Sequence, residues 1–139
     1  MEAVRRLKVF VGSPSDNASN RDAAKQAIEL VGCTLENDGL ILQSRMWELD
    51  AKPDVAEDAQ ASLNRQIVAD CDVYIFLFHT RLGTPTPRAA SGTAEEMALA
   101  LARLREESAH IRILTYFDAS PIPPTTNARE LGRLQDFRA

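Results

Sequence analysis

The chain has 139 residues and a net charge of −4, with 45% hydrophobic and 26% charged residues. This is the usual size of one domain, large enough to bury a core without disulfides or metals. The negative charge argues against binding nucleic acid by neutralising its phosphates. It does not exclude a small anionic ligand, whose binding needs only a few hydrogen-bond donors. We therefore predict a single domain over residues 1–139, with no direct nucleic-acid partner.

The sequence carries no pattern typical of export or of membrane insertion. Its N-terminus runs directly into a strand-like pattern instead of a signal peptide. The longest apolar run, 73–78, is far shorter than the roughly 20 residues that a membrane span needs. Cys33 and Cys71 have neither metal-ligand nor disulfide spacing, and we predict two buried free thiols. We expect a cytoplasmic protein with no membrane partner and no metal site.

Strand-like and helical patterns alternate along the chain. The predicted strands are 7–11, 40–46, 72–78 and 111–117, and the predicted helices are 18–36, a segment through 63–68, 94–107 and 127–137. The run 72–78 is apolar nearly throughout, which is typical of a central strand covered on both faces. In the first helix Ala24, Ile28 and Val31 form the predicted core stripe. Gly39 is predicted to close the connection to the second strand.

This alternation predicts βαβ units with right-handed crossovers. The expected fold is a three-layer α/β sandwich of the flavodoxin or Rossmann type, with a mainly parallel sheet of four to five strands. Because the pattern ends on a helix, we expect an N-terminal module of a longer protein. Ligands of such sheets bind outside the carboxyl ends of the strands. The loops that follow the strands are therefore the predicted binding edge.

Glu96 is the predicted catalytic residue of this edge. The expected buried stripe of its helix is Met97, Ala100, Leu101 and Leu104. On a helical wheel Glu95 falls almost opposite this stripe and is predicted to face solvent, whereas Glu96 falls at its flank. Adjacent helical residues diverge, so the two glutamates cannot flank one bond. The pattern therefore offers one working carboxylate.

A purely structural role for Glu96 is favoured at this point. The segment Thr93-Ala94-Glu95-Glu96 fits a capping box, in which Thr93 caps the helix and Glu96 reaches back to its backbone N–H. An acidic residue in a first helical turn is also favoured by the helix dipole. Spacing alone favours capping over catalysis.

Further candidates lie on the loops of the predicted binding edge. The loop after the first strand, residues 12–16, could hold phosphate or ribose. The helix start at residues 91–93 could bind an anion, and Trp47 could stack on a base. Arg81 and Arg88 could pair with a pyrophosphate, although ordinary turns, caps and solvated side chains explain these residues too. The predicted binding residues are Gly12, Ser13, Pro14, Ser15, Trp47, Arg81, Gly83, Ser91, Gly92 and Thr93.

Five segments in this order resemble a known family. KVFVGSPSD, WELD, CDVYIFLFHTRLGTPT, SGTAEEMALA and ILTYF are similar to segments of TIR-like domains at the N-termini of bacterial defence and STAND-type proteins, the DUF4062-like group. The resemblance covers residues 8–137. The wider superfamily includes nucleoside 2-deoxyribosyltransferases, whose Gly-Thr-x-x-Glu signature aligns with Gly92, Thr93 and Glu96. In those transferases the glutamate is the nucleophile, and in TIR NADases it engages the ribose beside the scissile bond.

The resemblance implies an NAD⁺-cleaving effector domain of antiphage defence, with Glu96 as its catalytic residue. NAD⁺ is then a substrate that is hydrolysed or cyclised, and no cofactor is needed. The resemblance also implies activation by self-association and a sensor or NTPase domain in the same longer chain. Cleavage of NAD⁺ releases neutral nicotinamide, so one carboxylate that stabilises the ribose cation suffices. The alternatives are a deoxyribosyltransferase-like enzyme and a non-catalytic self-association module.

Overall fold

The computed structural model describes residues 4–14, 17–45, 68–83, 85, 89–106 and 110–139. Its strands are β1 (Arg5–Gly12), β2 (Leu40–Arg45), β3 (Val73–Phe78) and β4 (Arg112–Phe117). Its helices are α1 (Ala18–Leu35), α4 (Gly92–Leu104) and α5 (Ala128–Arg138), with short 3-10 helices at Glu36–Asp38 and Val68–Asp70. The strands form one parallel sheet in the order β2-β1-β3-β4. The predicted α/β class and parallel sheet are confirmed.

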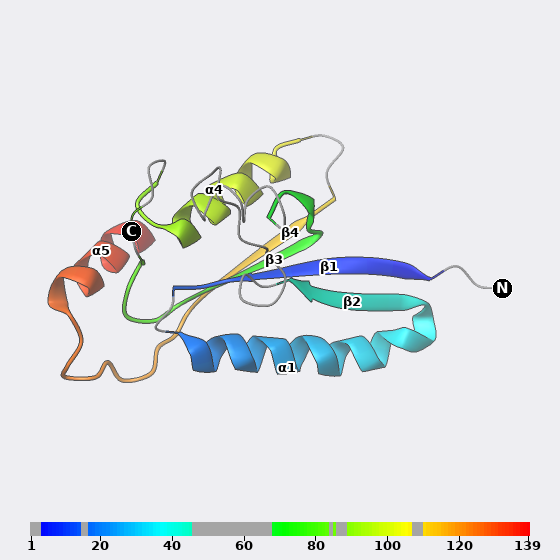
Figure 1. The fold of residues 1–139 in the computed structure, drawn as a ribbon, viewed down its shortest axis with the longest axis horizontal. Coiled ribbons are helices and arrows are strands. Elements are labelled where there is room, and N and C mark those ends of the chain that lie inside the picture. The colour runs from blue at the N-terminus through cyan, green and yellow to red at the C-terminus, as the bar shows by residue number, and fades with distance from the viewer. Residues whose placement is uncertain (1–3, 15–16, 46–67, 84, 86–88, 107–109) are drawn as a thin grey trace, which may run out of the picture.

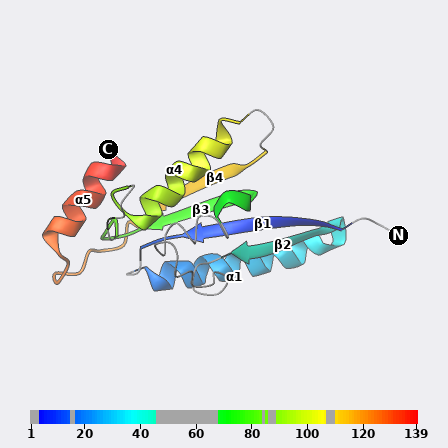
Figure 2. The same cartoon turned by 45° about the horizontal axis from the view of Figure 1, so that its top comes forward.

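The helices cover both faces of the sheet, which gives the predicted three layers. Figures 1 and 2 show α1 along one face and α4 along the other. The strand order explains this placement, because the chain moves outward one way from β1 to β2 and the opposite way from β3 to β4. Right-handed crossovers in opposite directions put their helices on opposite faces. The direction changes between β1 and β3, and this switch point is where such sheets bind ligands.

Two apolar clusters fill the spaces between the layers. On the α4 face the rings of Phe10, Tyr74 and Phe76 are buried, and the centroids of Phe10 and Tyr74 lie 6.0 Å apart. On the α1 face Val9 and other aliphatic side chains of β1 and β3 pack with Ile28. Successive residues of a strand point to opposite faces, so β1 contributes to both clusters. The sheet is therefore buried on both sides around β1 and β3.

The buried face of α4 is rotated from the predicted one. Ala100 is fully buried, but Leu101 and Leu104 are 39% and 47% exposed, so their predicted burial was wrong. The cause is Arg103, whose Nη1 donates to the carbonyl of Cys71 and, at 2.7 Å, to the hydroxyl of Tyr74. This guanidinium takes the inward position of the last turn, and the two leucines turn outward.

In helix α1 the observed buried face also differs from the predicted one. Ile28 is buried as predicted, whereas Val31 is 49% exposed and Cys33 is also exposed. An ideal Cβ on Gly32 would lie 3.7 Å from the Leu42 Cβ, so Gly32 faces the sheet at this turn. Val31 and Cys33 flank that position and point away from the sheet. Their predicted burial was therefore wrong.

The predictions for Gly39 and Cys71 are confirmed. Gly39 closes the connection to β2 in a left-handed conformation with φ 76°, as predicted. Cys71 is buried as predicted, and burial raises the pKa of its thiol to about 12. Of the helix predicted through 63–68, only Val68 lies in the described residues, and it is buried. None of the described helices is both long and apolar enough to cross a membrane.

The Tyr74 hydroxyl provides a test of this core. It donates to the carbonyl of Val68 and accepts from Arg103. Tyr74→Phe leaves the buried Val68 carbonyl without this donor, so we expect the free energy of unfolding to fall by about 1–3 kcal/mol. Tyr116→Phe removes a hydroxyl from a side chain that is 55% exposed, and should change it little. Urea denaturation of both variants checks this, and equal effects would contradict the assignment.

Candidate functional site at the switch point of the sheet

The Glu96 carboxyl group lies against the last residue of β1. Glu96 is only 6% exposed. An ideal Cβ built on Gly12 would fall 2.6 Å from Glu96 Oε2, and 2.9 and 3.0 Å from ring carbons of Phe10 and Phe76. Only a glycine backbone allows so close an approach. The carboxyl group predicted to be catalytic is thus placed at the end of β1, beside the switch point between β1 and β3.

The capping-box explanation of Glu96 is wrong. The N-cap of α4 is Ser91, whose Oγ accepts from the Ala94 N–H at 3.0 Å, and the helix begins at Gly92. The predicted cap, Thr93, lies inside the first turn and is buried. A capping box needs an acid three residues after the cap, and Ala94 occupies that position. Glu96 is the fifth residue of the helix, so its inward position is not explained by reaching back to the N-cap.

Glu95 was predicted to face solvent and is 5% exposed, so that prediction was also wrong. Ser91 and Thr93 of the same turn are buried as well. A helical wheel assumes one covered face, whereas the start of α4 is covered on more than one side. Burial therefore does not separate the two glutamates. What separates them is the contact of Glu96 with Gly12.

Three segments predicted to bind ligand meet at Gly83. This residue has φ +111°, a conformation that favours glycine. An ideal Cβ on Gly83 would lie 3.4 Å from the Ser91 Cβ and 3.8 Å from the Pro14 Cβ. The structure thus brings the loops after β1 and β3 together with the start of α4. Pro14, Gly83 and Ser91 were all predicted binding residues.

The remaining predicted residues differ in their placement. Gly92 and Thr93 begin α4 beside this junction. Ser13 is half-buried, and its Oγ lies 3.4 Å from the Arg21 Nη1. Arg81 is half-buried after β3, and its Nε has no hydrogen-bond partner among the described residues. The residues outside the described part of the chain are Ser15, Trp47 and Arg88.

Arg133 of α5 holds the loop between β3 and α4, a role that sequence reasoning missed. Its Nη1 donates to the Gly83 carbonyl at 3.0 Å, and its Nη2 donates to the Ala90 carbonyl. Glu130 forms an ion pair with the same guanidinium at 3.3 Å. Two points of the loop, Gly83 and Ala90, are thus tied to one side chain. A sequence pattern gives no signal for this, because Arg133 resembles an ordinary arginine of a polar helix.

A second missed group links β4 to the start of α1. Asn20 Nδ2 donates to Asp118 Oδ2 at 2.8 Å and to Asn17 Oδ1 at 2.6 Å. The other carboxylate oxygen of Asp118 accepts from the backbone N–H and the hydroxyl of Ser120. The hydrogen bonds from Asn20 and then from Ser120 hold the pKa of Asp118 well below its ordinary value. All four residues lie at the carboxyl edge of the sheet.

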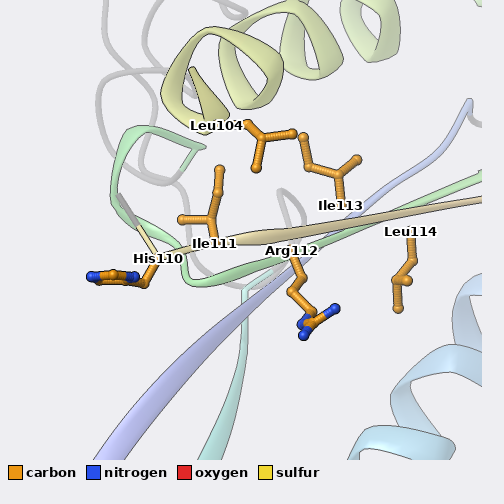
Figure 3. A pocket seen from close by; sticks show the side chains of 6 residues that line it. All are labelled: Leu104, His110, Ile111, Arg112, Ile113 and Leu114. Carbon is orange, nitrogen blue, oxygen red and sulfur yellow. The ribbon is translucent and has the colours of Figure 1, made fainter. Parts of the chain in front are cut away.

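The cavity drawn in Figure 3 lies at the opposite end of the sheet. It has a volume of about 500 Å³ and is lined by Leu104, His110, Ile111, Arg112, Ile113 and Leu114. Leu104, Ile111 and Ile113 gather beneath α4, whereas Arg112 and Leu114 point to the other side of β4 (Figure 3). The hollow therefore follows the outer edge of the sheet. We do not assign it to the Glu96 site, which lies at the other ends of the strands.

The described residues contain no group of three or more histidines, cysteines or acids arranged to hold a metal ion. His110 is exposed, and the Nε2 atom of His79 lies 3.4 Å from the Ser120 carbonyl oxygen.

Comparison with known families places the chain in one of them. The family described as a domain of unknown function, DUF4062, matches residues 8–139. The chain belongs to this family. Comparisons with curated proteins and with solved structures gave no match. The match confirms the DUF4062 part of the resemblance, and it carries no information on an activity.

The contact between Gly12 and Glu96 predicts a large cost for a single added methyl group. Gly12→Ala forces the Glu96 carboxyl group and the two neighbouring rings to shift, which should lower the free energy of unfolding by about 1–3 kcal/mol. Gly132→Ala is the matched control, because nothing lies within 4 Å of its Cβ position in α5. It should raise stability by roughly 0.5–1 kcal/mol. Thermal or urea denaturation compares them, and two stabilised variants would refute the close contact.

The lowered pKa of Asp118 predicts a pH dependence of stability. The ionised carboxylate is stabilised by folding, so its contribution is full above its ordinary pKa of 3.8 and is lost as the pH falls below it. Asp118→Asn should therefore be less stable than the wild type at neutral pH, and this difference should shrink on acidification. Urea denaturation at pH 7 and at about pH 3 measures it. A difference that stays constant across this range would contradict the assignment.

Proposed function

We propose that this domain cleaves NAD⁺ at the bond between nicotinamide and ribose, with Glu96 as the catalytic carboxylate. The observation that carries the proposal is the burial of Glu96 against Gly12, at the carboxyl end of the strand beside the switch point. Such switch points are the usual ligand sites of parallel sheets. The capping box that offered an alternative explanation is absent, since Ser91 caps the helix. The resemblance to TIR-like domains supports the same role.

The chemistry suits a single carboxylate. As the bond from ribose C1′ to the pyridinium nitrogen breaks, its electron pair passes to nitrogen and nicotinamide leaves as a neutral molecule. Positive charge develops on the ribose, where the Glu96 carboxylate stabilises it electrostatically. Water then adds to C1′ and releases a proton, which gives ADP-ribose. Capture of C1′ by a group of the adenine in place of water gives a cyclic product.

We further propose that the domain works as a TIR-like effector in bacterial antiphage defence. The resemblance supports a cytoplasmic protein that is activated when several copies associate, with a sensor or NTPase domain in the same chain. Self-association matters for the design of an assay, because isolated copies of such domains can be inactive. The assay therefore needs a form of the protein that is clustered deliberately, for example on a multivalent scaffold.

Release of nicotinamide from NAD⁺ by the clustered protein tests the proposal. Glu96→Gln keeps the size of the side chain and removes its charge, so we expect kcat to fall by about 10²–10³-fold. Glu95→Gln is the matched control, because Glu95 is the neighbouring residue and equally buried. It should retain most of the activity.

Two results would overturn the proposal. Activity that survives Glu96→Gln removes the catalytic assignment, and a clustered wild-type protein that releases no nicotinamide removes the NAD⁺ reaction itself. Base exchange between deoxynucleosides, with NAD⁺ left intact, would instead indicate a deoxyribosyltransferase-like enzyme.

A further inference from the structure

The start of α1 lacks the cap that its sequence offers. A helix leaves the N–H groups of its first turn without acceptors inside the helix. Asparagine is among the best residues for capping them, and Asn17 stands at the N-cap. Its side chain nevertheless makes no capping hydrogen bond, and the first turn contains no acidic residue. The Asn17 amide is instead held by Asn20, at 2.6 Å.

Asp118 fixes the orientation of both amides. An ionised carboxylate can only accept, so Asn20 must direct its Nδ2 toward Asp118. The same Nδ2 faces Asn17, which must therefore direct its Oδ1 toward Asn20. An aspartate is ionised at neutral pH, and the lowered pKa of Asp118 keeps it so under more acidic conditions too, so this order of donors and acceptors is maintained. The Asn17 Nδ2, a donor, is left facing elsewhere.

That donor has no acceptor in the described part of the chain. Asn17 is only 2% exposed, and its Nδ2 is buried without a hydrogen-bond partner among the described residues. Buried polar groups in native proteins nearly always have partners, so an exception calls for an explanation. Arg21 lies at the same end of the helix, with its Nη1 3.3 Å from the Pro14 carbonyl oxygen. Backbone N–H groups, an amide donor and a guanidinium thus gather at one helix end.

We propose that the start of α1 binds a phosphate group of the nucleotide, with Asn17 as a direct donor. A set of donors at a helix N-terminus is complementary to an anion. The inference rests on the proposed function for the identity of the nucleotide. The Asn17 N–H donates to the Pro14 carbonyl at 3.2 Å, and Pro14 is two residues from Gly12, against which Glu96 lies. At about 3.8 Å per residue, the chain between them limits the separation of the two sites to on the order of 10 Å. This separation suits a ribose at Glu96 and its phosphate at α1.

Binding of inorganic pyrophosphate to the purified protein tests the phosphate site directly. Asn17→Asp exchanges the donor for an acceptor of nearly the same shape and adds a negative charge. An acid at a helix start is favourable, so this variant should fold. Asn37→Asp makes the same charge change on the exposed 3-10 helix after α1. By calorimetry, the wild type and Asn37→Asp should bind pyrophosphate equally, and Asn17→Asp at least about tenfold more weakly.

Two results would overturn the phosphate site. One is a wild-type protein that does not bind pyrophosphate, and the other is an Asn17→Asp variant that binds it as tightly as Asn37→Asp does. Kinetics with NAD⁺ then separate this proposal from the catalytic one. Asn17→Asp should raise KM about tenfold and change kcat by less than about twofold. If pyrophosphate binding depends on Asn17 but no nicotinamide is released, the phosphate site stands and the NAD⁺ reaction falls. An unchanged KM in an active enzyme removes the phosphate site alone.

Discussion

The contact between the Glu96 carboxyl group and the Gly12 backbone constrains the whole carboxyl edge of the sheet. A side chain at residue 12 would collide with this carboxyl group and with the rings of Phe10 and Phe76, so β1 has to end on glycine. The contact also fixes where α4 begins. With Ser91 as the N-cap, the fifth residue of the helix reaches the end of β1. One close approach thus couples the end of a central strand, the aromatic cluster and the start of a helix.

The start of α4 is held in turn by elements on either side of it. Gly83 fits between Ser91 and Pro14, in a conformation that favours glycine. From α5, Arg133 binds the loop at Gly83 and at Ala90. Burial of two adjacent glutamates is costly unless their charges are compensated, and the N-terminal end of a helix is a favourable place for negative charge. The fold therefore supports an acidic group at the carboxyl end of β1, the edge at which parallel sheets usually bind ligands.

The sequence was sufficient for the parts of the structure that depend on local pattern. The apolar run of β3 predicted a strand buried on both faces, and the rule for parallel sheets predicted that Pro14, Gly83 and Ser91 would lie on one edge with Glu96. The errors at Glu95, Leu101 and Cys33 each depend on a neighbour that local pattern does not show. The start of α4 is covered on more than one side, Arg103 takes the inward position of its last turn, and Gly32 faces the sheet in α1. Arg133 and the Asn17–Asn20–Asp118 group depend on contacts between distant segments. No spacing rule connects residues 20 and 118, so the sequence alone could not reveal them.

The two ends of the proposed site differ in chemical character, and this difference bears on the choice of substrate. The start of α1 presents donors suited to an anion, whereas Glu96 presents a carboxylate suited to a centre that carries or develops positive charge. NAD⁺ combines a cationic pyridinium with a phosphate separated from it by one ribose, and so matches both ends. A deoxynucleoside has no phosphate for the α1 end, and its base usually leaves as a poor anion that needs protonation. The donors at α1 and the carboxylate belong to different elements, so each can be removed without removing the other. NAD⁺ is the proposed ligand because it offers a partner to both ends, whereas a nucleoside offers one only to Glu96.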